Sequence, residues 1–115
     1  MDMEKIQTII KKFSEERDWE KFHNPKNLSM ALSVEASELL EIFQWLNLEQ
    51  ADNLNKEKKE HAKQEIADIA VYLIRMCMHL DINLEEAIIE KMKLNEKKYP
   101  LFDKDGKKID YGKKK

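Results

Sequence analysis

The chain of 115 residues has room for one domain around a single hydrophobic core. Hydrophobic residues make up 42% and charged residues 38% of it, a balance typical of soluble folded proteins and not of disordered ones. A net charge of −2 gives no basic field for nucleic acid, and no apolar run is long enough to cross a membrane. We therefore expect a cytoplasmic protein without a signal peptide that binds neither nucleic acid nor membranes.

Helices dominate the expected secondary structure, because the chain has only two glycines and two prolines. Apolar residues recur at helical spacing in four stretches, which are about residues 3–16, 27 to 45 or 46, 56–80 and 83–98. Asp2 is expected to cap the first helix, Asn83 with Glu86 to start the fourth, and the following proline to end it. Residues 18–26 are expected to form a loop, and residues 47–55 a polar connection.

These helices predict an all-α domain over residues 1–100 with a four-helix bundle core. The third helix is apolar over a wider arc than a four-helix monomer needs, and this surplus predicts a symmetric homo-oligomer. Cys77 lies in that apolar stretch, so we expect a buried thiol and neither a disulfide nor a nucleophile. Residues 101–115 are a basic tail with a turn at Asp105-Gly106, expected to be a loose hairpin or disordered. A solubilising role is favoured for this tail over phosphate binding.

Two short carboxylate pairs are the most informative feature of the chain. Glu35 and Glu38 lie in the second expected helix. Glu65 and Asp68 lie in the third, and both pairs have the i, i+3 spacing that places two side chains on one helix face. Both pairs are embedded in apolar sequence, where bare anions are costly to bury and a divalent cation between the helices would remove that cost. The alternative is that these acids are ordinary charges on solvent-facing helix surfaces.

The ligand chemistry indicates which cation fits. Carboxylates without histidine are hard ligands that suit Mg²⁺, or Mn²⁺. A di-iron bundle would need Glu-x-x-His on two helices, which this chain lacks, and His61 and His79 are expected to have no role. Because carboxylate-bound Mg²⁺ keeps coordination positions open for substrate phosphates, the acids point to phosphate chemistry.

Two further groups of side chains could complete a nucleotide site. Lys91, Asn95 and Lys98 share one face of the fourth helix and could bind phosphates, although a solvated lysine face is the alternative. Tyr99 follows them at the end of that helix. Rings that could contact a base or sugar are Trp19, Phe22, His23, Trp45 and Tyr72. The tryptophans could equally be core or interface anchors, and His23 an ordinary polar surface group.

The whole pattern resembles a known family. Glu-x-x-Glu on one helix, followed by Glu-x-x-Asp on the next, is similar to the signature of the MazG-like all-α nucleoside triphosphate pyrophosphohydrolases. Three further segments resemble the dCTP pyrophosphatase branch of that superfamily, and they are residues 16–28 (ERDWEKFHNPKNL), 38–45 (ELLEIFQW) and 91–100 (KMKLNEKKYP). The resemblance covers about residues 6–100. The linker rich in Asn and Lys between the second and third helices is a departure from it, and the tail has no counterpart in it.

The resemblance implies a Mg²⁺-dependent hydrolase that converts a nucleoside triphosphate to a monophosphate and pyrophosphate. It implies dCTP or a modified deoxycytidine triphosphate as the substrate, nucleotide-pool sanitation as the role, and a dimer or tetramer with shared active sites. It also implies that one acid, Glu38, orients or deprotonates the attacking water. By the same resemblance the Mg²⁺ ligands are Glu35, Glu38, Glu65 and Asp68, the phosphate-binding residues are Lys91, Asn95, Lys98 and Tyr99, and the residues of the base and sugar pocket are Trp19, His23, Asn27, Trp45 and Tyr72.

Two other functions stay open on sequence grounds. The chain could be a nucleotide-binding regulatory module that keeps the site but turns over slowly. It could also be a structural helical interaction protein, in which the acids are surface charges and the apolar stripes bind a partner. This last function predicts no stabilisation by a nucleotide with Mg²⁺.

Overall fold

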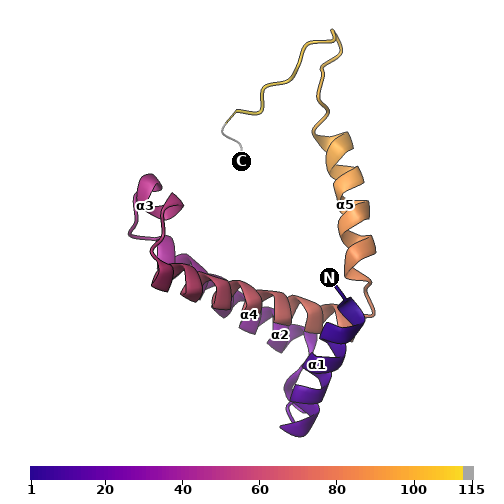
Figure 1. The fold of residues 1–115 in the computed structure, drawn as a ribbon. Coiled ribbons are helices and arrows are strands. Elements are labelled where there is room, and N and C mark those ends of the chain that lie inside the picture. The colour runs from indigo at the N-terminus through magenta and orange to yellow at the C-terminus, as the bar shows by residue number, and fades with distance from the viewer. Residues whose placement is uncertain (113–115) are drawn as a thin grey trace. The chain divides into compact units, whose positions relative to one another are not determined.

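The computed structural model describes residues 1–112, and these form helices and no strand (Figure 1). The α-helices and one short 3-10 helix are α1 (Met3–Glu16), η1 (Glu20–Phe22), α2 (Pro25–Phe43), α3 (Leu48–Asp52), α4 (Lys56–Leu80) and α5 (Leu84–Lys98). The prediction of an all-α chain is therefore confirmed for the described residues. The chain divides after Ile82 into two units, which are described separately below. No helix within residues 1–112 is long and apolar enough to span a membrane.

The helix starts follow from local capping. Each α-helix begins after an Asp or Asn whose side chain accepts a hydrogen bond from the backbone N–H three residues later; the caps are Asp2, Asn24, Asn47, Asn55 and Asn83. The predicted caps Asp2 and Asn83 are thus confirmed. The second helix begins at Pro25, two residues earlier than predicted, because Asn24 caps it and proline suits the first helical position. It also ends earlier than predicted, at Phe43.

The connection between α2 and α4 was predicted to be non-helical, and this is wrong for residues 48–52. The short helix α3 forms there because Asn47 and Gln50 make a reciprocal capping box. Asn47 Oδ1 accepts from the Gln50 backbone N–H at 2.8 Å, and Gln50 Oε1 accepts from the Asn47 backbone N–H at 3.0 Å. The segment is polar and too short to show an apolar period, so residues 1–112 contain five α-helices where four were predicted.

The first unit, Met1–Ile82, is built on the pair of helices α2 and α4. These lie side by side, and α1 packs against α4 (Figure 1). The two helices run antiparallel, because the short α3 segment joins the end of α2 to the start of α4. The buried apolar residues are Ile10, Leu28, Ala62, Ile74 and Cys77, so the prediction of a buried thiol at Cys77 is confirmed.

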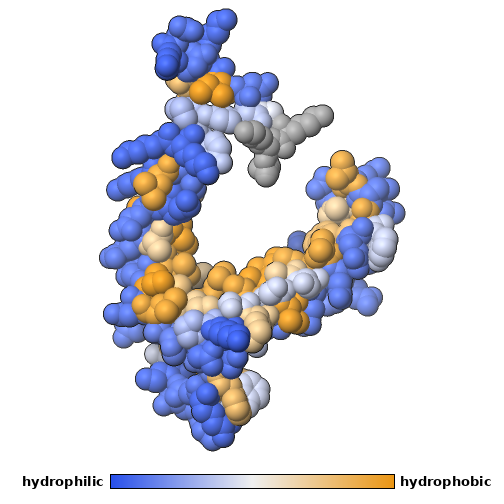
Figure 2. Space-filling view, turned by 180° about the vertical axis from the view of Figure 1, so that it is seen from behind, coloured by the Kyte–Doolittle hydropathy of each residue, from blue (hydrophilic) through white to orange (hydrophobic). Residues whose placement is uncertain are grey.

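Much of the apolar surface of this unit stays exposed. Figure 2 shows apolar side chains, in orange, at the molecular surface. In the first unit the exposed large apolar residues include Ile9, Met30, Val34, Leu40, Ile66 and Leu73. A monomeric soluble protein seldom exposes so many large apolar side chains on its helices.

The second unit consists of α5 and a hairpin that follows it. The rings of Tyr99 and Tyr111 pack edge to face with centroids 5.5 Å apart, and the Tyr111 hydroxyl donates to the Pro100 carbonyl at 2.8 Å. A bridge joins Phe102 to Lys108, and Gly106 turns the chain with a φ of 78°. The predicted turn at Asp105-Gly106 and its hairpin are therefore present. Residues 113–115 of the predicted basic tail lie outside the described residues.

Candidate active site

Three of the four predicted acids come together between α2 and α4, and the fourth, Asp68, is exposed and lines the pocket beside them. Glu35, Glu38 and Glu65 each offer a carboxylate oxygen within 4.8 Å of the others. Because the two helices are antiparallel neighbours, the pair on α2 faces the pair on α4. Glu65 is only 9% exposed and Glu35 and Glu38 are half-buried, so none of these three carboxylates is fully exposed to solvent.

The electrostatics of this cluster are unfavourable without a cation. The pKa of Glu35 is raised from 4.5 to about 7, mainly by burial and next by the charge of Glu38. Hydrogen bonding with Glu65 and the charge of Asp68 act in the same direction. The buried oxygens Glu35 Oε2 and Glu65 Oε2 have no hydrogen-bond partner in the described part of the chain. Unpartnered, hard oxygen donors on two facing helices fit a divalent cation such as Mg²⁺.

One histidine lies closer to the acids than expected. His61 Nε2 is 3.4 Å from Glu65 Oε1, one turn earlier on α4. The i, i+4 spacing of His61 and Glu65 is the signal in the sequence that indicates this contact. His61 is largely exposed, so it borders the cluster from the solvent side.

A pocket of about 360 Å³ opens beside the acids. Glu35 and Asp68 line it together with apolar and aromatic side chains and Arg75, and the remaining lining residues are Ile9, Ile10, Phe13, Trp19, Val71 and Tyr72. The rings of Phe13 and Trp19 meet edge to face with centroids 5.6 Å apart. An apolar pocket with a few convergent polar groups is the usual form of a small-molecule site. Of the predicted base-pocket residues, this pocket contains Trp19 and Tyr72.

The other predicted base- and sugar-pocket residues lie elsewhere. His23 lines a neighbouring hollow with Ser14 and Arg75, and its pKa is lowered, first by burial and then by the charge of Arg75. The side-chain amide of Asn27 donates to the Phe22 carbonyl at 2.9 Å and so holds the loop before α2. Trp45 is 86% exposed beyond the end of α2 and does not line the pocket beside the acids.

The predicted phosphate-binding residues belong to the second unit. Lys91, Asn95 and Lys98 lie on α5, and Tyr99 follows at its C-terminal end. Lys98 Nζ lies 5.4 Å from the centre of the Tyr99 ring, and Asn95 Nδ2 contacts Met92 Sδ at 3.8 Å. Lys91, Lys98 and Tyr99 are exposed and free to meet a ligand, while Asn95 is half-buried.

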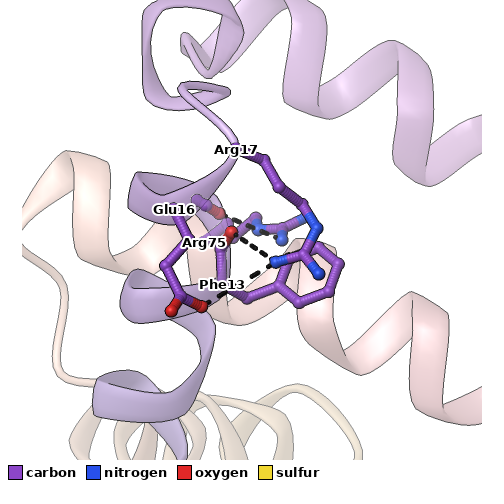
Figure 3. A network of polar contacts seen from close by, with 5 residues as sticks. Phe13, Glu16, Arg17 and Arg75 are labelled. Atoms are coloured by element: carbon purple, nitrogen blue, oxygen red, sulfur yellow. Dashed lines mark hydrogen bonds and ion pairs between the residues drawn. The ribbon is translucent and has the colours of Figure 1, made fainter.

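Sequence reasoning missed Arg75. Its guanidinium donates a hydrogen bond to the Ser14 hydroxyl at 3.2 Å. Ser14 lies near the C-terminal end of α1, and Figure 3 shows this region. There the Arg17 side chain folds back over the Phe13 ring, with the guanidinium carbon 3.7 Å from the ring centre. The missed signal was an arginine within the apolar run of α4, three residues after Tyr72 and on the same face.

Comparison with known proteins places these features in a family. The sequence model of the MazG-like family matches residues 30–113, which include all four acids. The chain belongs to the MazG-like family. This MazG-like chain is 37% identical over 101 residues to dCTP pyrophosphatase 1 of Rattus norvegicus, a match that covers 86% of the chain and 59% of the rat protein. It is 35% identical over 100 residues to dCTP pyrophosphatase 1 of Homo sapiens, a match that covers 85% of the chain and 59% of the human protein.

A solved structure supports the fold. A pyrophosphatase from Archaeoglobus fulgidus superposes with a TM-score of 0.82 at 40% identity, over 87% of this MazG-like chain and 94% of the archaeal one. The chain spans about 59% of the length of the curated relatives named above. The resemblance to MazG-like proteins and to their dCTP pyrophosphatase branch is thereby confirmed, and so is the MazG-like all-α fold.

Proposed function

We propose that this MazG-like chain is a nucleoside triphosphate pyrophosphohydrolase that converts a (d)NTP to a (d)NMP and pyrophosphate. The observation that carries the proposal is the cluster of carboxylates between α2 and α4 beside an aromatic pocket. The relatives named dCTP pyrophosphatase 1 favour dCTP, or a modified deoxycytidine triphosphate, as the substrate. Nucleotide-pool sanitation is the role that such a reaction would serve, and a cytoplasmic location remains a prediction.

In this proposal Glu35, Glu38, Glu65 and Asp68 hold Mg²⁺, with Mn²⁺ as the alternative ion. When bound, the cation would neutralise triphosphate charge and polarise the phosphoryl group. Glu38 is proposed to orient or deprotonate the attacking water, since a carboxylate beside the reacting centre can serve as a general base. Trp19 and Tyr72 would hold the base in the pocket next to the acids.

The remaining predicted residues are proposed to act in an assembly. The exposed apolar residues of the first unit support a homodimer or homotetramer built on a four-helix core. In such an assembly active sites are shared between subunits, and the α5 residues Lys91, Asn95, Lys98 and Tyr99 would bind phosphates. An exposed tryptophan is a frequent interface anchor, so Trp45 would contact the nucleotide only where a second copy covers it. His23 from the loop before α2, and Asn27 from the first turn of α2, would support the pocket.

Two alternatives make different predictions. A nucleotide-binding regulatory module would bind the nucleotide with Mg²⁺ and turn it over slowly. A structural interaction protein would bind neither, and its acids would have no ligand. The unpartnered buried oxygens of Glu35 and Glu65 argue against the structural protein, because an unsatisfied buried acceptor costs stability without a compensating function.

The test is to incubate the purified chain with Mg²⁺ and each common dNTP and NTP, and to resolve the products by chromatography. Monophosphate and pyrophosphate from a deoxypyrimidine triphosphate are the expected products. Diphosphate and phosphate would mean that the wrong bond has been assigned. Binding without turnover, measured with a non-hydrolysable triphosphate, would favour the regulatory module instead.

A further inference from the structure

Arg75 lies at the end of the aromatic pocket opposite the acids. It follows Asp68 by seven residues on α4, about 10 Å along a helix axis, and both residues line the same pocket. Tyr72 lies between them on the same face, and its ring centre is 5.4 Å from the guanidinium carbon. The pocket therefore has a negative end, an aromatic middle and a positive end.

The guanidinium of Arg75 is not neutralised. Within residues 1–112 no carboxylate lies within ion-pair distance of it, and its only side-chain hydrogen bond is the 3.2 Å contact to Ser14 Oγ. Its Nε is buried and has no hydrogen-bond partner. A buried donor without an acceptor costs free energy, so the site is better satisfied when a ligand supplies acceptor atoms. Arginine presents such donors as a planar fork, which suits a ligand with two adjacent acceptors.

We propose that Arg75 is a specificity-determining residue that reads the edge of the nucleobase. The base would lie among Phe13, Trp19 and Tyr72, and the guanidinium would donate to N3 and O2 of cytosine, which are adjacent acceptors. Uracil and thymine carry an N–H at position 3, so a donor would face a donor. This inference rests on the proposed function, because it takes the triphosphate to be bound at the acids.

The position of Arg75 favours the base over a phosphate. Apart from the two acids and Arg75 itself, the side chains that line this pocket are apolar or aromatic, among them Ile10, Val71 and Tyr72, and such walls suit a planar ring rather than a hydrated polyanion. Phosphates are best placed at the acids, where a bound cation neutralises them. The test must therefore distinguish a contact of Arg75 with the base from a contact with a phosphate.

The experiment compares dCTP with dUTP, which have the same sugar and phosphates and differ at the base edge. The kcat/KM values are measured with Mg²⁺ for the wild type, Arg75→Met, Arg75→Lys and the control Arg17→Met. The control removes the same charge from the outer side of Phe13, outside the pocket. The ratio of kcat/KM for dCTP to that for dUTP is expected to fall about 10- to 100-fold in Arg75→Met and to stay constant in Arg17→Met. Arg75→Lys keeps the charge but lacks the fork, so its ratio is expected to fall as well.

An unchanged ratio of kcat/KM for dCTP to that for dUTP in Arg75→Met would overturn the inference. If both kcat/KM values fell by the same factor, Arg75 would be assigned to the phosphates. Circular dichroism melts show whether each variant folds, and Arg75→Lys carries the test if Arg75→Met does not. If the wild type hydrolyses neither nucleotide, the proposed function fails on its own. The tryptophan fluorescence of the chain then reports binding, and equal affinity of wild type and Arg75→Lys for dCTP would overturn the reading of the base independently of turnover.

Discussion

Replacing Glu35 with glutamine tests the electrostatic account of the acid cluster. The substitution keeps the size of the side chain and removes the charge at every pH. In the metal-free protein the pKa of Glu35 rises from 4.5 to about 7, because of burial first and repulsion from Glu38 next. The folded state therefore retains this proton up to a higher pH than the unfolded state does. Its contribution to stability is fully present below about pH 4.5 and is lost as the pH rises through about 7.

The magnitude follows from the two pKa values. Each tenfold change in proton affinity corresponds to about 1.4 kcal/mol, so the metal-free wild type is less stable above pH 7 by up to about 3 kcal/mol on account of this group. Solvent reaches the half-buried Glu35 in part and screens the repulsion, which makes this value an upper bound. Glutamine does not titrate, so the stability of Glu35→Gln does not fall with pH on account of this position. We expect the variant to match the wild type near pH 5 and to exceed its stability by roughly 1–3 kcal/mol at pH 8.

The assay is urea unfolding in EDTA at pH 5 and pH 8, followed by circular dichroism at one fixed protein and salt concentration. The matched control is Glu41→Gln, which makes the same change at an exposed position of α2. Adding Mg²⁺ at pH 8 is expected to stabilise the wild type more than Glu35→Gln, because the variant has lost a ligand. A difference between variant and wild type that is the same at both pH values would refute the reasoning, and so would a variant less stable than the wild type at pH 8 in EDTA.

Three further predictions concern the site and the core. Glu38→Gln is expected to keep the circular dichroism spectrum of the wild type and to lose at least about 100-fold in kcat, while normal activity would remove Glu38 from the site. Trp45→Ala is expected to raise KM for dCTP more than it lowers kcat, and unchanged values of both would mean that Trp45 does not contact the nucleotide. Leu28→Ala is expected to lower the free energy of unfolding by about 2–5 kcal/mol in urea titrations, since Leu28 is only 1% exposed; a loss below 1 kcal/mol would contradict the described core.

Local signals in the sequence were sufficient for most of the fold. The long helices were predictable because their apolar residues repeat over many turns and because Asp2 and Asn83 cap their starts. The start of α2 lies two residues before its predicted position because Asn24 caps the helix and Pro25 occupies its first turn, although a proline is also typical of a loop. The helix α3 was missed because five residues cannot display a helical period, although Asn47 and Gln50 carry its capping signal.

The candidate site was predictable where the residues of a pair lie on one helix, and not where they lie far apart. The carboxylate pairs needed only i, i+3 spacing and two neighbouring helices to converge. The contact between Ser14 and Arg75 joins residues 61 positions apart, and it depends on how α1 crosses α4, which no local pattern encodes. The packing of the loop before α2 likewise directs His23 into a neighbouring hollow, which shares Arg75 with the pocket beside the acids.

The unsatisfied groups of the chain support one interpretation of the pocket. In the described residues the buried side-chain atoms without a hydrogen-bond partner are Glu35 Oε2, Glu65 Oε2 and Arg75 Nε. Glu35 and Arg75 line the same pocket, and if they served stability alone, such opposite charges would be expected to pair, because a pair costs less than isolated buried charges. Instead, Arg75 makes no ion pair within residues 1–112, and the aromatic side chains Tyr72 and Trp19 line the pocket with it. Unpaired groups of this kind cost stability and suit an elongated ligand with a polyanionic end and an acceptor-bearing ring, which is the shape of a nucleoside triphosphate.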